Sequence, residues 1–168
     1  MMRLVIMGVA GCGKSTVGAG LATRSGVPYR DGDDLHPAAN VAKMAAGTPL
    51  TDDDRWPWLD LVARALATDA PLMIGCSALK RSYRDRIRHG AGGPVLFVHL
   101  SGARKVIEAR MAGRTGHFMP VALLDSQFAT LEPPAADEWH LTVDIDQPLN
   151  AIVTQILTSF ADPATSAH

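Results

Sequence analysis

Short apolar runs alternate with longer amphipathic segments along this chain. The runs at 3–7, 71–75, 95–100 and 141–145 do not alternate with polar positions and lie between turn signals, which is typical of buried strands. A weaker strand is predicted at 27–30. Helical periodicity predicts helices at about 14–25, 37–46, 54–68, 79–89, 103–112, 120–131 and 148–160.

Strands that alternate with helices predict an α/β fold with a mainly parallel sheet. Right-handed crossovers then place ligands at the carboxyl ends of the strands. A length of 168 residues, with 47% hydrophobic and 20% charged residues, suits one globular domain. We expect this domain to span residues 1–161, with 162–168 as a frayed tail.

Charge and cysteine content narrow the classes of partner. The formal net charge of −1 argues against a broad polyanion-binding surface, so we expect small-molecule ligands and no nucleic acid. Cys12 and Cys76 are the two cysteines, and one of them lies inside a glycine-rich loop, which suits reduced thiols and a cytoplasmic protein. No apolar stretch approaches the length of a bilayer span, so no membrane association is expected.

A phosphate-binding motif follows the first predicted strand directly. Residues 8–16 read GVAGCGKST, which matches G-x-x-x-x-G-K-[ST] from Gly8 to Ser15. Glycines allow positive φ and leave no Cβ between the backbone and phosphate oxygens. The residues expected to contact a nucleotide are Gly8, Ala10, Gly11, Cys12, Gly13, Lys14, Ser15 and Thr16.

Two side chains of this motif carry its chemistry. The Lys14 ammonium can follow the β- and γ-phosphates, and the Ser15 hydroxyl suits Mg²⁺. The N-terminus of the following helix favours a bound anion. Thr16 is expected to cap or pack. A chance glycine-rich turn is the alternative, but strand, loop and helix signals all agree with nucleotide binding.

Carboxylates follow the second predicted strand in the segment DGDDLHP, residues 31–37. In an extended chain Asp31 and Asp33 point to opposite sides, so one can serve a metal-bound water or a neighbouring loop while the other faces an acceptor hydroxyl. We assign Asp33 to the acceptor. The alternative is that Asp33 or Asp34 only caps the helix that follows His36 and Pro37.

Several strings together resemble the gluconokinase family of small P-loop kinases, which is related to shikimate kinases. They are GVAGCGKST, DGDDLHP, the segment from Asn40 to Leu59 with its DDDR and PWL, CSALKRSYRD, the GHFMP to LLDSQFATLE region, and VDIDQPL. The resemblance implies a three-layer α/β/α fold with a mobile lid, at about 113–121. It also implies transfer of the γ-phosphoryl group of ATP to the terminal hydroxyl of D-gluconate, and a homodimer.

Gluconate has one carboxylate and several hydroxyls, so its site needs cations and hydrogen-bonding side chains. Arg55 suits a carboxylate or can anchor Asp33, and Lys80 lies just after a strand end. His36 can donate to a hydroxyl. Alternatively, the two cations lie on a solvated helix surface and the histidine caps a loop. The family resemblance implies that Gln127 contacts substrate hydroxyls.

Other residues of these helices are expected to be structural. Arg84, Arg86 and Arg88 are predicted to form a solvated helix face, with Arg84 paired locally to Asp85 or a nearby carboxylate. Met44 is expected to pack in the core. The same holds for most of the apolar helical pattern formed by Trp56, Trp58, Leu59, Leu61, Val62 and Leu66.

The predicted lid carries a second group of cations. Arg114 is the candidate that stabilises charge on the transferring phosphoryl group and helps to exclude water. Arg110 resembles the residue that packs on adenine or approaches the phosphates, and both arginines can instead be exposed helix side chains. His117 can meet substrate or only hinge the loop. Asp146 and Pro148 can lie against adenine, or simply connect a strand to a helix.

These assignments predict in-line transfer without a covalent enzyme intermediate. Lys14, Mg²⁺ on Ser15, and Arg114 share the phosphoryl charge, and Asp33 orients the acceptor hydroxyl and takes its proton. Two alternatives stay open: a kinase for another small polyol acid such as shikimate, and a nucleotide-binding module without turnover.

Overall fold

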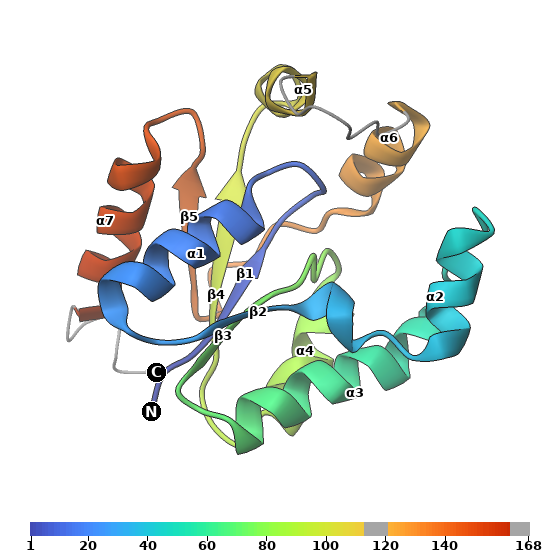
Figure 1. Ribbon diagram of the computed structural model, residues 1–168, viewed down its shortest axis with the longest axis horizontal. Coiled ribbons are helices and arrows are strands. Elements are labelled where there is room, and N and C mark those ends of the chain that lie inside the picture. The colour runs from blue at the N-terminus through green and yellow to red at the C-terminus, as the bar shows by residue number, and fades with distance from the viewer. Residues whose placement is uncertain (113–120, 162–168) are drawn as a thin grey trace.

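The computed structural model describes residues 1–112 and 121–161 (Figure 1). A five-stranded sheet has the order β2-β3-β1-β4-β5. The strands are β1 (Arg3–Met7), β2 (Tyr29–Asp31), β3 (Leu72–Gly75), β4 (Leu96–Ser101) and β5 (His140–Asp144). Every neighbouring pair in it is parallel, which confirms the predicted α/β class and its parallel sheet.

Both faces of the sheet are covered by helices, so its central strands are mostly apolar. Alternate residues of β1 show this directly: Leu4 and Ile6 belong to the hydrophobic cluster on one face, and Val5 and Met7 to the cluster on the other. In register, Leu4 lies between Met73 and Leu96 of the two flanking strands. The continuous apolar runs in the sequence therefore reflect burial on two sides.

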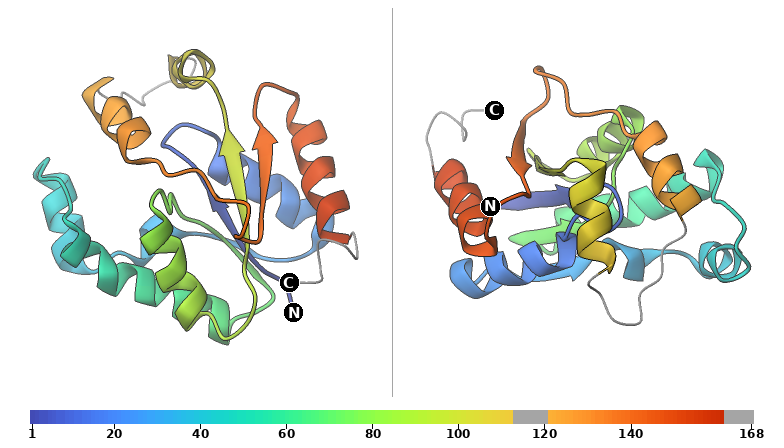
Figure 2. Two further views of the ribbon diagram at one scale, coloured as in Figure 1. Left: turned by 180° about the vertical axis from the view of Figure 1, so that it is seen from behind. Right: turned by 90° about the horizontal axis from the view of Figure 1, so that it is seen from above.

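Two pairs of helices form the outer layers (Figures 1 and 2). On one face α1 (Lys14–Ser25) packs beside α7 (Leu149–Ala161), and on the other α3 (Asp52–Thr68) packs beside α4 (Arg81–Gly90). Helix α2 (Ala38–Ala45) projects at the side away from α7. Helices α5 (Arg104–Ala112) and α6 (Val121–Thr130) lie beyond the carboxyl ends of the strands, toward which the arrowheads point.

The local structure after β2 differs from the extended chain that was expected. Residues Gly32–Leu35 form a 3₁₀ helix, η1, and Asp31 caps it by accepting a hydrogen bond from the Asp33 amide at 3.0 Å. Neither Asp33 nor Asp34 caps α2, because its N-cap is Pro37. The simple alternation of Asp31 and Asp33 is therefore wrong: a short polar side chain has turned the backbone.

Helix α3 begins two residues before its predicted start. Thr51 and Asp54 form a capping box, in which the Asp54 amide donates to Thr51 Oγ1 and the Thr51 amide donates to Asp54 Oδ2. Asp52, Asp53 and Asp54 occupy the first turn, where the helix dipole favours negative charge. Thus this cluster of acids, which follows the capping residue Thr51, marks the start of the helix.

Two burial expectations, for Arg84 and Met44, were wrong, whereas most of the apolar pattern of α3 is buried as expected. Arg84 is fully buried, since it pairs with a buried carboxylate far away in the sequence. Met44 is 44% exposed on the projecting helix α2, where no other element covers it enough to bury it. Leu61 is 38% exposed, whereas Trp58, Leu59, Val62 and Leu66 of the same pattern are buried as predicted. No helix in the described ranges is long and apolar enough to cross a bilayer.

Candidate active site

The phosphate-binding loop joins β1 to α1 and needs its glycines. Gly8, Gly11 and Gly13 all have positive φ, and a Cβ on Gly8 would lie 2.9 Å from the Leu100 carbonyl oxygen. Lys14 opens α1 and folds back over the loop, where its Nζ donates to the Gly8 and Val9 carbonyls at 2.9 and 3.1 Å. Ser15 and Thr16 are exposed in the first turn of the helix.

Cys12 belongs to this loop, and its side chain is fully buried. Burial raises the pKa of its thiol, and the nearby positive charge of Lys14 only partly opposes that shift. A buried thiol with a raised pKa is a poor nucleophile. Cys12 therefore fills space under the phosphate-binding loop.

A cavity of about 400 Å³ lies between the phosphate-binding loop, α5 and the start of α7. Gly13, Thr16, Arg110 and Pro148 are among its lining residues, so residues predicted to contact a nucleotide from three parts of the chain meet here. Arg110 Nη2 also donates to the Ile145 carbonyl. Asp146 is exposed and is not among the lining residues.

Asp33 lies on η1, at the carboxyl end of β2. Trp58 anchors η1 because its Nε1 donates to the Gly32 carbonyl at 2.8 Å. Although 79% of the Asp33 side chain is open to solvent, desolvation by the surrounding protein raises the pKa of its carboxyl, and the negative charge of Asp31 raises it further. The positive charge of Lys14 acts in the opposite direction, as does that of His36 whenever its ring is protonated.

His36 is held rigidly next to Asp33. Its ring stacks on Trp58 with a centroid distance of 4.1 Å, and its side chain is 4% exposed. Asn40 Nδ2 donates to the Asp54 carbonyl at 2.9 Å and lies 3.2 Å from His36 Nδ1. A carbonyl can only accept, so this nitrogen is the amide NH₂, and Nδ1 of the neutral ring accepts from it.

The proton of the neutral imidazole consequently resides on Nε2, which lies 4.0 Å from Asp33 Oδ1. Burial lowers the pKa of His36, while the carboxylate of Asp33 opposes the shift. At neutral pH the ring is therefore uncharged and presents one N–H donor beside a carboxylate. Such a pair can bind a hydroxyl group through both its oxygen and its proton.

A second cluster, which we call the acceptor cluster, consists of Asp52, Arg55, Lys80 and Tyr83. The Tyr83 hydroxyl donates to Asp52 Oδ1 at 2.5 Å, and Arg55 and Lys80 each lie 3.5 Å from the same carboxylate. Both cations also lie over the Tyr83 ring, at 5.5 and 5.6 Å from its centroid. The hydrogen bond from Tyr83 is the main cause of the lowered pKa of Asp52.

This cluster combines two cations with one internal carboxylate, so it retains positive charge that can bind an anionic ligand. Asp52 and Tyr83 were not identified from the sequence. Helical spacing could have indicated them, since Asp52 precedes Arg55 by three residues and Tyr83 follows Lys80 by three.

Gln127 lies on α6, against the phosphate-binding loop. Its Oε1 accepts a hydrogen bond from the Ala10 amide at 2.6 Å. This contact is with the phosphate-binding loop and involves none of His36, Arg55 and Lys80. Arg114 and His117 lie outside the described residues.

The two halves of the site are joined at the carboxyl edge of the sheet. The Gly8 amide donates to the Ser77 carbonyl at 3.2 Å, and Ser77 belongs to the segment between β3 and α4 that ends at Lys80. Lys14 and Asp33 are close enough for the lysine charge to lower the pKa of the carboxyl. A phosphate-binding loop, a carboxylate and an anion-binding cluster on one parallel sheet edge define a P-loop kinase.

Comparisons with known proteins agree with this class. The model of a family described as "AAA domain" matches residues 4–134. The thermoresistant gluconokinase of Escherichia coli is 46% identical over 91% of this chain and 90% of its own length. The crystal structure of a gluconokinase from Sinorhizobium meliloti has a TM-score of 0.86 and 50% identity, covering 94% of this chain and 90% of that one.

A shikimate kinase from Aquifex aeolicus has a TM-score of 0.56 at 17% identity, covering 95% of this chain and 96% of its own, which is a likeness of fold alone. The similarity to gluconokinases is of a different order, because it holds at over 40% identity across nearly the whole chain. This chain belongs to the gluconokinase family of P-loop kinases.

Proposed function

We propose that the protein phosphorylates D-gluconate on its terminal 6-hydroxyl with ATP as donor, giving 6-phospho-D-gluconate. The observation that carries this proposal is the pairing of Asp33 and His36 next to the phosphate-binding loop, together with the two cations of the acceptor cluster. Of these, Arg55 lies in the first turn of α3 and Lys80 at the end of the loop that follows β3. Family membership supports gluconate as the acceptor and ATP as the donor.

The donor half comprises the phosphate-binding loop and the cavity beside it. The backbone amides at the start of α1 and the Lys14 ammonium bind the phosphates, and the cavity that Thr16, Arg110 and Pro148 line takes the adenosine. Mg²⁺ fits this half, because the exposed Ser15 hydroxyl and the carboxylates after β2 supply the oxygen ligands that this cation prefers. When bound, the cation neutralises charge on the phosphates.

In the acceptor half, Arg55 and Lys80 bind the gluconate carboxylate, and His36 Nε2–H donates to a hydroxyl. Asp33 accepts a hydrogen bond from the reacting hydroxyl, orients its oxygen toward the γ-phosphorus and takes its proton as the new P–O bond forms. Lys14 follows the charge as it moves to the leaving oxygen. We further propose that Arg114 closes over the transferring group, and that Gln127 positions the phosphate-binding loop in this state.

The decisive experiment measures ADP release with a panel of acceptors. We expect saturable release with D-gluconate and little with shikimate, other sugar acids or water alone. Identification of the product as 6-phosphogluconate establishes the position of transfer. Equal or greater activity with shikimate would mean that gluconate is not the specific substrate. Binding of ATP without release of ADP would indicate a nucleotide-binding module without turnover.

A homodimer and a cytoplasmic location complete the proposal. The first rests on family resemblance, and the second on two cysteines that suit reduced thiols. Light scattering after size-exclusion chromatography tests the first, since a monomer of 17.9 kDa and its dimer differ twofold in mass. A monomeric mass across the working concentration range would contradict it.

A further inference from the structure

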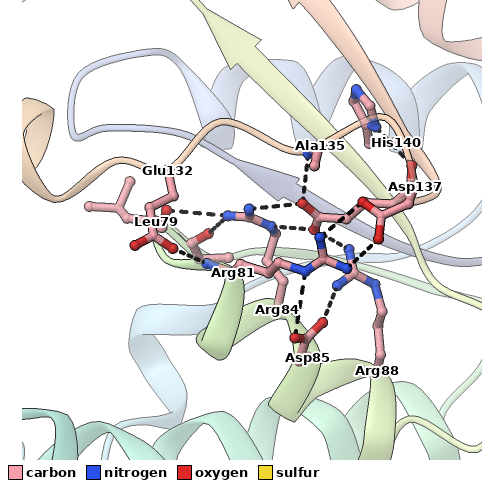
Figure 3. A network of polar contacts seen from close by, with 11 residues as sticks. Leu79, Arg81, Arg84, Asp85, Arg88, Glu132, Ala135, Asp137 and His140 are labelled. Carbon is pink, nitrogen blue, oxygen red and sulfur yellow. Dashed lines mark hydrogen bonds and ion pairs between the residues drawn. The ribbon is translucent and has the colours of Figure 1, made fainter.

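A buried ion pair links α4 to the segment before β5 (Figure 3). Arg84 is 0% exposed and Glu138 is 1% exposed by side chain, and two parallel hydrogen bonds join them: Nε to Oε1 at 2.7 Å and Nη2 to Oε2 at 3.1 Å. Burial alone would favour the protonated acid, but hydrogen bonds from Arg84, the Ala135 amide and Arg88 hold the pKa of Glu138 at about 2. Both partners are therefore charged.

The pair uses its remaining hydrogen-bonding capacity on the backbone. Arg84 Nη1 donates to the carbonyls of Ala78 and Leu79 at 2.8 and 3.2 Å. On the other side, Glu138 Oε2 accepts from the Ala135 amide at 2.8 Å. Glu138 thus orients the guanidinium, and the guanidinium binds two consecutive carbonyls of the loop 76–80.

Loop 76–80 connects β3 to α4 and contacts both halves of the site. Its Ser77 carbonyl accepts the hydrogen bond from Gly8 of the phosphate-binding loop, and its last residue is Lys80 of the acceptor cluster. Between them Ala78 has a φ of 45°, a left-handed conformation that a residue with a Cβ rarely adopts. A backbone in such a conformation persists only where its surroundings hold it.

A second connection holds the same turn from the outside. The Glu132 amide donates to the Leu79 carbonyl at 2.8 Å, and the Arg81 amide donates to Glu132 Oε1 at 2.9 Å (Figure 3). The Glu132 side chain thus caps the start of α4. The N-cap residue Lys80 makes no capping hydrogen bond with its own side chain. Residues 132–138 therefore stabilise loop 76–80 in two ways: Glu132 binds it directly at Leu79, and Glu138 acts on it through Arg84.

Stability alone does not explain a fully buried ion pair. Well-packed apolar side chains of similar volume often stabilise a fold as well or better, because the pair loses its hydration on folding. What an apolar residue cannot supply is a rigid fork that meets a carboxylate on one side and two carbonyls on the other.

We propose that Arg84, oriented by Glu138, is a positioning residue for the acceptor half of the site: it fixes the turn at Ala78 and Leu79 so that Lys80 meets the substrate carboxylate. This inference rests on the proposed gluconokinase function. The ion pair contacts neither substrate, and through the position of Lys80 it affects the binding of the acceptor rather than that of ATP.

The test is the variant Arg84→Met/Glu138→Gln. It removes both charges together and keeps an amide oxygen for the Ala135 N–H, so no buried charge is left unpaired. Loss of a hydrogen bond between charged groups costs roughly tenfold to a hundredfold in affinity, so we expect the gluconate KM to rise about tenfold to a hundredfold. The ATP Kd, measured by calorimetry, and the midpoint of thermal unfolding are expected to stay close to those of the wild type.

A conservative variant and a matched control complete the design. Arg84→Lys keeps the charge opposite Glu138 but lacks the fork, so its gluconate KM is expected between those of the wild type and the double variant. In the control Asp60→Ala/Arg86→Ala, an exposed two-bond ion pair between α3 and α4 is removed, and both substrates should bind as before.

An unchanged gluconate KM in the double variant would overturn the proposal. Equal losses for ATP and gluconate would do the same, because they indicate a general structural role, and so would failure of both Arg84 variants to fold. A wild-type protein that does not turn over gluconate would instead refute the proposed function, which keeps the two failures apart.

Discussion

His36 presents its Nε2–H toward the carboxylate of Asp33, at 4.0 Å from Oδ1, because Asn40 occupies its other ring nitrogen. The gap exceeds a direct hydrogen bond. A substrate hydroxyl placed between the two side chains can accept from His36 and donate to Asp33. The geometry therefore assigns each of them a separate part in holding one acceptor oxygen.

The pH dependence of turnover is expected to report Asp33. Desolvation and the charge of Asp31 raise its pKa above the ordinary value of 3.8. A general base must be deprotonated, so kcat/KM should fall as pH decreases, and this acidic limb should begin at a higher pH than for an ordinary aspartate. Asp33→Asn should lose about 10²–10⁴-fold in kcat with ATP affinity retained.

The same shift has a consequence for stability. A carboxyl whose pKa is raised by folding stabilises the protein below its unfolded pKa, and this contribution is lost as pH rises through the folded pKa. At neutral pH the ionised Asp33 therefore weakens the fold, and Asp33→Asn should unfold at a temperature equal to or above that of the wild type. An inactive variant that also unfolds early would point to a structural role for Asp33 instead.

Asn40 is expected to select the tautomer of His36. In Asn40→Asp the amide donor is lost, so the new carboxylate accepts from Nδ1–H and Nε2 becomes unprotonated. We expect the gluconate KM to rise and the ¹⁵N chemical shifts of the His36 ring to show the exchanged tautomer. The Asp54 carbonyl also loses its donor, which should cost about 1–3 kcal/mol in the free energy of unfolding.

Asn150→Asp is the matched control, because it makes the same chemical change at an exposed position on α7. It should leave both the gluconate KM and the histidine shifts unchanged. If Asn40→Asp kept the original ring tautomer and yet lost activity, tautomer selection would not be its role.

The sequence was sufficient for features that depend on neighbours in the chain. The apolar runs predicted the strands. The glycine-rich loop and the acids after β2 were placed at the same edge of the sheet, because strand ends in a parallel sheet converge there. Pairings between distant segments could not be found in this way. Arg84 was expected at the surface since nothing within a helical turn indicates Glu138, which is 54 positions away.

The acceptor cluster shows the same limit at shorter range. Arg55 and Lys80 were proposed as cations for a carboxylate, but their mutual placement around Asp52 and Tyr83 depends on the packing of α3 against α4. Residue type indicated what each cation can bind. Only the tertiary structure showed that both contact the same aspartate.

Loss of either cation from the acceptor cluster should weaken binding of the gluconate carboxylate. Hydrogen bonds to charged groups are worth about 1.5–3 kcal/mol, so Arg55→Ala or Lys80→Ala should raise the gluconate KM roughly 10- to 100-fold. The ATP KM should not change. Glucitol, which has the hydroxyls but no carboxylate, provides the sharper comparison: the variants should lose the preference for gluconate over it.

Arg64→Ala on the exposed face of α3 is the control for charge alone. It should leave the ratio of gluconate to glucitol activity as in the wild type. If Arg55→Ala and Lys80→Ala reduced activity on both acceptors equally, these cations would act on the phosphoryl group and not on the carboxylate.

Gly18 in α1 is expected to resist a substitution that usually stabilises helices. Replacing an interior helical glycine with alanine normally gains about 0.5–1 kcal/mol, but here the new Cβ would overlap the ring of Tyr29, which packs against both Gly18 and Gly75. Gly18→Ala should therefore lower the free energy of unfolding by about 1–3 kcal/mol in urea titrations. Gly20 lies two residues further along the same helix. The new Cβ in Gly20→Ala would meet only Val153 Cγ2, at 3.0 Å, so this variant should be close to neutral. Equal stability of the two variants would show that Tyr29 moves aside readily, and that its slot between α1 and β3 is not tightly packed.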